Sequence, residues 1–400
     1  MKKINYTYKY RLKPNESQKQ IFEQYFGSVR FVYNYFLNLR QTQYKATGKS
    51  DSYYQQQKQL TELKQDEKYS WLKLINSQTL QVALQNLESA YTRFFRRKSK
   101  YPVFKKKRYN NSFCVPQNIK VVNQRIYIPK FKEGIKLKEH RKLEGKICFA
   151  TISKTCTNKF FVSITVEKEI KPQKSTGKEV GIDLGIKELV ICSNGSRFAN
   201  NKYISKYSKK LKKSQQHLSR KVKGSHQYEK QRLKVTLIQE KISNCRIDNL
   251  HKISSKLIKE NDLICLEDLN VKGMMANHKL SKSISDVAWS ELTRMLGYKG
   301  NWHDVVIHKI NRWYPSSKTC NHCGYIKSDL TLDNRYWTCP KCHSNIDRDL
   351  NAAINILEEG KRELSAGTVD YTDGELVRHS NINNNVITHD SMKLEAHCFS

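Results

Sequence analysis

The sequence predicts an α+β protein of several domains, with a helical lobe and a small all-β domain before an α/β domain. Three observations lead to this expectation. The hydrophobic period changes along the chain from two to about 3.6 and back to two. The second half follows the order strand, hairpin, helices, strand, helix, strand, helix, which is an α/β order. Four cysteines near the end of that region have the spacing C-x2-C-x15-C-x2-C, which is typical of structural zinc.

The composition indicates a polyanionic partner. The chain has 400 residues, enough for two or three cored domains, and 73 Lys and Arg against 37 Asp and Glu give a formal net charge of +36. Nucleic acid fits this excess, because each neutralised phosphate releases condensed counterions. A membrane surface is the competing polyanion. No run of 18 apolar residues and no separate basic amphipathic helix exists, so we expect no membrane partner.

The first hundred residues predict a strand followed by helices. Residues 3–12 alternate between apolar and polar or basic side chains, as in a half-buried strand with a basic outer face. The segment 14–17 ends the strand and offers helix-capping side chains. Apolar residues then recur at helical spacing over roughly 15–100, with one helix predicted at 76–98. Gly27-Ser28 is a possible break that would make a helix-turn-helix.

Short strands separated by Gly, Asn and Pro are predicted over 110–170, and with the N-terminal strand they can close a small β-barrel. The polar segment 171–177 reads as a linker. After it we expect an α/β domain whose strands and helices occupy 180–186, 188–192, 201–260 (two basic helices broken near 224–225), 262–267, 286–299 and 305–307. The tail from about 361 is polar, and we expect it to be disordered.

Three carboxylates stand at the ends of these elements: Asp183 in an apolar strand, Glu267 at the end of another, and Asp349 at the start of a helix. A carboxylate in an apolar strand is costly to bury unless it is paired or binds a metal. Each one alone is also explained as a solvated strand end or a helix cap. Together they suit phosphodiester hydrolysis, in which two Mg²⁺ ions about 3.5–4 Å apart stabilise the attacking and leaving oxygens. Asp268 should point away from Glu267, and Asp347 can hydrogen-bond to the site.

The four cysteines Cys320, Cys323, Cys339 and Cys342 predict a closed tetrahedral Zn²⁺ site with a structural role. His322 and His343 are possible substitutes as ligands. Zinc would order a hairpin carrying Arg335, Tyr336 and Trp337, whose rings either contact nucleic acid or pack the hairpin itself. Because no apolar leader precedes the chain, we expect no oxidising compartment and interpret six further cysteines as buried thiols: Cys114, Cys148, Cys156, Cys192, Cys245 and Cys265.

One predicted helix is strongly basic. Like charges at i,i+3 and i,i+4 destabilise a free helix, and a phosphate backbone alongside would relieve them. The alternative is an ordinary solvated face. The basic residues are Lys202, Lys206, Lys209, Lys210, Lys212, Lys213, Arg220, Lys221 and Lys223.

The chain resembles the TnpB family of transposon-encoded RNA-guided DNA nucleases, which are similar to compact type V CRISPR effectors. Four segments over about residues 1–360 carry the resemblance. They are Gly181-Ile182-Asp183-Leu184-Gly185, the run from Leu266-Glu267-Asp268-Leu269-Asn270 to Met274, the run from Arg312-Trp313-Tyr314-Pro315-Ser316 to Cys320, and Asp347-Arg348-Asp349-Leu350-Asn351-Ala352-Ala353 after the cysteines. The opening Tyr10-Arg11-Leu12-Lys13-Pro14 also matches.

The resemblance implies an architecture. It consists of an RNase H-like (RuvC) nuclease domain at 178–312 and 344–360, a zinc-ribbon insertion at 313–343, a β-barrel wedge domain at 1–14 and 101–172, and a helical recognition lobe at 15–100. It further implies that Asp183, Glu267 and Asp349 are catalytic, holding two Mg²⁺ ions. The implied partners are a guide RNA from the transposon end and double-stranded target DNA, which is cut beside a short target-adjacent motif.

Two other functions remain open at this stage. One is a nuclease-inactive RNA-guided regulator that only binds DNA, and the other is a DNA-only transposase or resolvase. The intact acids argue against the first. A transposase of the related fold typically has Glu as its third acid, whereas Asp349 stands here. From the resemblance we expect a prokaryotic host and a cytoplasmic, nucleoid-associated protein.

Overall fold

The computed structural model describes residues 1–107, 111–331 and 333–367, and the chain divides near residue 170 into two compact units. Each unit has its own buried core. The division falls where the linker 171–177 is expected. None of the helices in the described ranges is long and apolar enough to span a bilayer. The predicted tail lies mostly outside the described residues.

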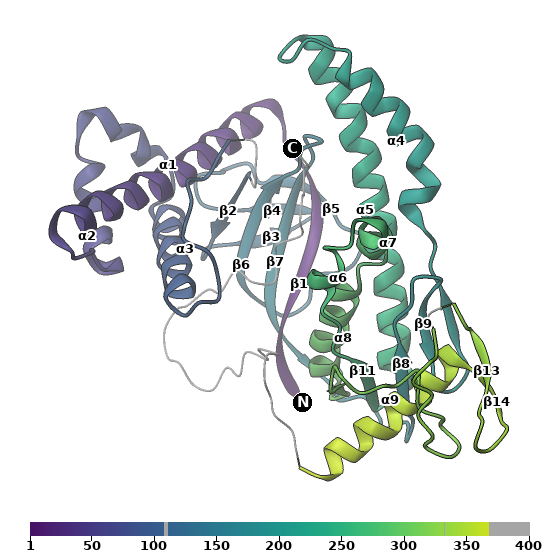
Figure 1. The fold of residues 1–400 in the computed structure, drawn as a ribbon. Coiled ribbons are helices and arrows are strands. Elements are labelled where there is room, and N and C mark those ends of the chain that lie inside the picture. The colour runs from purple at the N-terminus through teal and green to yellow at the C-terminus, as the bar shows by residue number, and fades with distance from the viewer. Residues whose placement is uncertain (108–110, 332, 368–400) are drawn as a thin grey trace. The chain divides into compact units, whose positions relative to one another are not determined.

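The first unit combines helices with a seven-stranded sheet of order β2-β6-β7-β1-β5-β4-β3 (Figure 1). The helical segments are α1 (Glu16–Thr47), α2 (Tyr53–Leu63), the 3₁₀ helix η1 (Glu67–Leu74) and α3 (Ser77–Phe95). The strands are β1 (Lys2–Lys13), β2 (Asn111–Val115), β3 (Lys120–Val122), β4 (Arg125–Tyr127), β5 (Ile135–Lys138), β6 (Lys146–Lys154) and β7 (Phe160–Ile170). In this order β2 and β3 are the two end strands and are not paired with each other, whereas the sequence suggested a barrel closed on itself.

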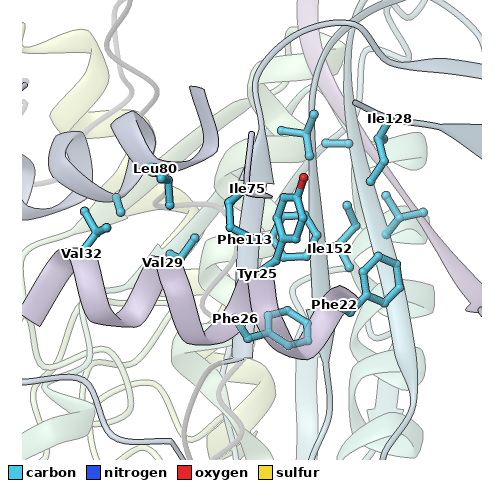
Figure 2. Close-up of a cluster of buried hydrophobic side chains, with 14 of the residues drawn as sticks. Phe22, Tyr25, Phe26, Val29, Val32, Ile75, Leu80, Phe113, Ile128 and Ile152 are labelled. Carbon is cyan, nitrogen blue, oxygen red and sulfur yellow. The ribbon is translucent and has the colours of Figure 1, made fainter. Parts of the chain in front are cut away.

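The predicted break at Gly27-Ser28 is wrong, because α1 is one continuous helix of 32 residues. Asn15 and Gln18 form a capping box at its start, and Gly48 ends it with a φ of 68°. A glycine inside a helix costs about 1 kcal/mol. Burial of the apolar face on both sides of Gly27 outweighs this cost, as Figure 2 shows for Phe22, Phe26 and Val29, among other residues.

The second unit is built on a five-stranded sheet of order β10-β9-β8-β11-β12. Strand β8 pairs antiparallel with β9, and β9 with β10, whereas β11 is parallel to both β8 and β12. The strands are β8 (Glu179–Asp183), β9 (Glu188–Cys192), β10 (Arg197–Ala199), β11 (Leu263–Glu267) and β12 (Val306–Ile310). Gly195 makes the predicted turn between β9 and β10 with a φ of 82°.

Helices cover both faces of this sheet. The helices of this unit are α4 (Tyr203–Ser219), α5 (His226–Glu260), α6 (Val271–Met274), α7 (His278–Val287), α8 (Trp289–His303) and α9 (Arg348–Ser365), of which α5, α8 and α9 pack on the sheet. Along β11 the side chains alternate: Ile264 and Leu266 join the core with α5 and α8, and Leu263 and Cys265 face a cluster with α9. The two faces therefore carry separate apolar contacts, as expected for a sheet with helices on either side.

Two further expectations need correction, one in this unit and one in both units. The tail does not begin at 361, because α9 continues to Ser365. Its last turns are held by the packing of Leu364 and by Glu363, which accepts hydrogen bonds from His308 at 2.7 Å and from the Asn311 amide at 3.2 Å. Not all the scattered cysteines are buried, since Cys148 is exposed and Cys156 and Cys245 are partly exposed. Cys148 lies in the part of β6 whose side chains are least covered.

Candidate active site and four-cysteine ribbon

Strands β8 and β11 bring two of the predicted acids to one edge of the sheet. Their parallel register pairs Ile182 with Leu266, and Asp183 and Glu267 are the next residue of each strand. Because the carboxyl ends of parallel strands meet at the same edge, both carboxylates lie where the two strands end.

Helix α9 brings the third acid to the same edge, because it packs directly on β8 (Figure 1). A Cβ atom at Gly181 would overlap the carbonyl oxygen of Ala353, and one at Gly360 would overlap the sulfur of Cys265. The two glycines therefore permit a close approach between helix and sheet. Asp349 lies in the first turn of α9. We call Asp183, Glu267 and Asp349 the acidic triad.

The other two carboxylates act electrostatically on Asp183. The pKa of Asp183 is raised to about 7, first by burial and then by the charges of Glu267 and Asp349, while Arg348 opposes them. Burial also raises the pKa of Glu267, against a hydrogen bond from Ser316. A divalent cation would relieve both the burial cost and the repulsion, and carboxylate oxygens are the ligands that Mg²⁺ prefers. The donor type therefore suits a hard cation, although the three carboxylates do not all lie within 4.8 Å of one another.

Cationic side chains hold Asp349 in its place. Arg335 contacts one carboxylate oxygen at 2.8 Å, and Arg348 contacts the other at 3.1 Å. Asp347, which was expected to hydrogen-bond to the site, instead caps α9 by accepting from the Asp349 and Leu350 amides. It is itself paired with Arg197 at 2.7 Å. The role of Asp347 is thus to fix the start of the helix that carries Asp349.

The loop after β12 supports the β11 end of the triad. Ser316 donates a hydrogen bond from its hydroxyl to Glu267. Asp268 points elsewhere, as expected, and pairs with Arg312 and with Lys309 at 3.3 Å. Sequence reasoning did not single out Ser316, although it lies in the Pro315-Ser316-Ser317 segment that carried part of the family resemblance.

Replacing Ser316 by alanine should lower activity moderately. The change leaves Glu267 buried without its hydrogen-bond donor, and a hydrogen bond to a charged group is worth about 1.5–3 kcal/mol. On the Mg²⁺-dependent nuclease function that the family resemblance implies, we expect a roughly 10- to 150-fold lower cleavage rate at limiting Mg²⁺, with partial recovery at high Mg²⁺. Ser317→Ala, one residue along, is the matched control. Equal activity of both variants would show that the hydrogen bond does not position Glu267.

The four cysteines come together as predicted. Their sulfur atoms all lie within 4.8 Å of one another, and they are the only such set of three or more ligand groups in the described part of the chain. The Sγ atoms of Cys320 and Cys342 are 3.6 Å apart, as are those of Cys323 and Cys339. A tetrahedron with bonds of about 2.3 Å has edges of about 3.8 Å, so the spacing fits Zn²⁺.

Two similar turns shape the four-cysteine ribbon, which we define as residues 313–347. Gly324 and His343 each follow the second cysteine of a pair and have φ values of 71° and 57°. Their amides donate to the carbonyls of Cys320 and Cys339 at 2.8 and 2.9 Å. His343 therefore serves the turn, and neither it nor His322 belongs to the ligand set.

The ribbon hairpin of β13 (Tyr336–Thr338) and β14 (Asn345–Asp347) separates its two aromatic residues. Trp337 is buried in the ribbon core, and Tyr336 is exposed. The sequence left open whether these rings pack the hairpin or contact nucleic acid. For Trp337 the structure shows packing. The ribbon is tied to α9 by Asn351 and Asn355, whose amides donate to the carbonyl of Thr319 at 2.7 and 2.6 Å.

The basic residues predicted to face a polyanion extend from the N-cap of α4 to just after its end, and all of them are exposed. Helix α4 has no acidic residue and no buried residue, and it runs alongside α5 as a long helical pair (Figure 1). Its lysines lack neutralising partners within the helix, so a bound phosphate backbone would relieve their repulsion.

Three family models match the chain. They are described as a probable transposase (residues 161–278), a Cas12f1-like TNB domain (289–356) and a helix-turn-helix domain (1–49). Two relatives carry the name "Putative RNA-guided DNA endonuclease". The one from Streptomyces pristinaespiralis is 37% identical and covers 92% of each chain. The one from Escherichia coli K12, InsQ, is 32% identical and covers 92% of this chain and 95% of that relative.

Among solved structures, a Cas12f1 chain in complex with sgRNA and target DNA matches with a TM-score of 0.54 and 16% identity, covering 86% of this chain and 83% of that one. The fold and the ribbon thus define a compact protein of the Cas12f1-like fold class. Identity to the curated relatives over nearly the whole length then settles the family. The chain belongs to the TnpB family.

Proposed function

We propose that this protein is an RNA-guided, Mg²⁺-dependent DNA endonuclease encoded by a transposon, which cuts double-stranded DNA beside a short target-adjacent motif. The observation that carries the proposal is the arrival of three carboxylates at one sheet edge in a chain of the TnpB family. The strand order of the second unit and the fold likeness to Cas12f1 support an RNase H-like assignment for this domain.

The chain's own residues would prepare the site for hydrolysis. Two Mg²⁺ ions, when bound, would stabilise the attacking and leaving oxygens of the phosphodiester. Asp183, Glu267 and Asp349 would be the residues that hold these ions. Ser316 orients Glu267, and Arg335 and Arg348 orient Asp349. Asp183 is partly buried, which limits the contact of its carboxylate with bulk water and strengthens its attraction for cations.

The remaining parts would serve the nucleic acids. A guide RNA from the transposon end would read the target by base pairing, while the protein holds the backbone through its net positive charge and the exposed lysines of α4. The ribbon would hold a structural Zn²⁺. We assign the sheet and helices of the first unit to the wedge domain (1–14 and 101–172) and the recognition lobe (15–100). A nucleoid-associated protein in a prokaryotic cytoplasm agrees with these roles.

The deciding experiment is to purify the protein from cells that carry its transposon, sequence the bound RNA, and offer a supercoiled plasmid containing the matching target beside a randomised flank. We expect one discrete RNA, linearisation that needs Mg²⁺, and loss of cutting after RNase treatment. Binding without cutting would favour the nuclease-inactive regulator. Cutting that RNase leaves unchanged would favour the DNA-only transposase, to which the probable-transposase description points.

A further inference from the structure

Trp313 is a large aromatic residue that the fold leaves in solvent, in the loop whose Ser316 bonds to the acidic triad. Its side chain is 86% exposed, the highest fraction among the large apolar residues in the described ranges. A buried tryptophan removes about 150–250 Å² from water, so this exposure forgoes a large hydrophobic gain. Folding therefore does not explain why a tryptophan stands here.

The segment around Trp313 is held on both sides. Before it, Arg312 pairs with the Asp268 carboxylate and donates from Nε to the Asp268 carbonyl at 2.9 Å. At Trp313 itself, the amide donates to the Asn311 side chain at 2.9 Å. After it, Ser316 bonds Glu267. The exposed ring is thus carried by a loop that is anchored at both ends. Arg312 binds Asp268, the residue after Glu267, and Ser316 binds Glu267 itself.

The surroundings of the ring indicate what covers it. The two residues before it, Asn311 and Arg312, are exposed and polar, so the preceding part of the loop does not extend the ring into an apolar surface. A cationic side chain from a partner is disfavoured, because the chain carries a formal net charge of +36. A nucleobase fits, since every base has a flat π face and its phosphates are attracted by the net charge.

We propose that Trp313 is a stacking platform for an unpaired base of the DNA strand being cut, and that it places the neighbouring phosphate at the acidic triad. This rests on the proposed nuclease function. Trp313 is a positioning residue, because it touches the substrate away from the reacting atoms. Stacking tolerates any base, as a guided enzyme that cuts many sequences requires.

The first test measures the binding of a short fluorescent single-stranded DNA that does not match the guide, using the complete complex with its RNA and the Asp183→Ala change to prevent cutting. Base stacking on an aromatic ring is worth about 1–3 kcal/mol, so Trp313→Ala should raise the Kd about 5- to 150-fold. Trp313→Phe keeps a flat ring and should stay within about threefold. Trp313→Leu keeps apolar bulk without a π face and should resemble Trp313→Ala.

The second test measures single-turnover cleavage of a matched double-stranded target by complexes with an intact triad. Trp313→Ala and Trp313→Leu should cut more slowly by a similar factor. Target binding through the guide and the Mg²⁺ concentration at half-maximal rate should stay unchanged, which a disturbed triad would not allow. Trp313→Phe should cut nearly as the wild type does.

Three results separate the two proposals. If the wild type cuts and Trp313→Ala matches it in both assays, the stacking role is wrong and the nuclease function stands. If Trp313→Leu performs as well as Trp313→Phe, apolar contact replaces stacking and the inference is overturned. If the wild type cuts nothing, the proposed function fails, and the oligonucleotide affinities still decide whether the ring binds a base.

Discussion

Replacing Asp183 by alanine is expected to reduce DNA cleavage by about a thousandfold or more while leaving RNA and DNA binding unchanged. Asp183 is the member of the acidic triad whose pKa is raised to about 7, by burial and by the charges of its two acidic neighbours. Removing it takes away a proposed cation ligand, and metal stabilisation of the transition state is worth several kcal/mol. Each 1.36 kcal/mol is tenfold in rate, so a loss of about 4 kcal/mol gives this factor.

The measurement is single-turnover cleavage of a labelled target at saturating Mg²⁺, with binding followed by mobility shift. Asp248→Asn is the matched control, because it removes an exposed carboxylate of the same unit that pairs only with Lys252 at the surface of α5. Asp248→Asn should cut normally. Cleavage by Asp183→Ala at more than about a tenth of the wild-type rate would remove the proposed site.

A stability measurement on Asp183→Asn separates an effect on chemistry from an effect on folding. The folded-state pKa of Asp183 lies above its ordinary value, so the carboxyl stabilises the fold fully below pH 4 and loses this contribution as the pH rises to about 7. At pH 8 without Mg²⁺ the ionised carboxylate therefore destabilises the protein. Asp183→Asn should unfold at a temperature no lower than that of the wild type under these conditions.

The second large effect is expected from loss of the zinc site. The ribbon core has only five buried residues, two of them cysteine ligands, so apolar packing alone gives it little stability. Structural zinc contributes about 10–16 kcal/mol in small zinc-binding peptides. Cys339→Ser or a strong chelator should therefore unfold the ribbon and abolish cleavage. Cleavage depends on the ribbon because Arg335, at its hairpin, holds Asp349.

Zinc content by mass spectrometry, near-ultraviolet circular dichroism from the buried Trp337 and cleavage should fall together in Cys339→Ser. The control is Cys148→Ser, which changes an exposed cysteine outside the ribbon and should keep all three signals. Full zinc loss with normal dichroism and activity would contradict a structural role for the metal. The first unit has its own large buried core, so its helices and strands should persist in the far-ultraviolet spectrum.

The two ligand sets could be chosen from the sequence because their signals are local. Thiolates at C-x2-C spacing and carboxylates at the ends of apolar strands are visible without any knowledge of packing. The element order predicted an α/β domain, but that β8 and β11 are neighbours came only from the structure. The break at Gly27-Ser28 was wrong because local propensity is weak beside the burial of an aromatic face on both sides of it.

The residues that support the site could not be chosen in the same way. Ser316 and Arg335 are ordinary polar residues in the sequence, and each acquires a role only through a partner 49 or 14 positions away. Tyr336 and Trp337 are adjacent and similar, yet one is exposed and the other is buried, because neighbours on a strand face opposite ways. Which way each one points depends on the hairpin register.

By itself, the sequence determined the chemistry that this protein can hold: a closed set of soft thiolates, a set of hard carboxylates and a large excess of positive charge. These follow from residue type and spacing, which need no third dimension. Only the tertiary structure decided how the acids are held and that Trp313 stands in solvent on the loop that carries Ser316. Those properties come from the close approach of α9 to β8 and from a loop anchored at both ends, which are contacts between segments distant in the chain.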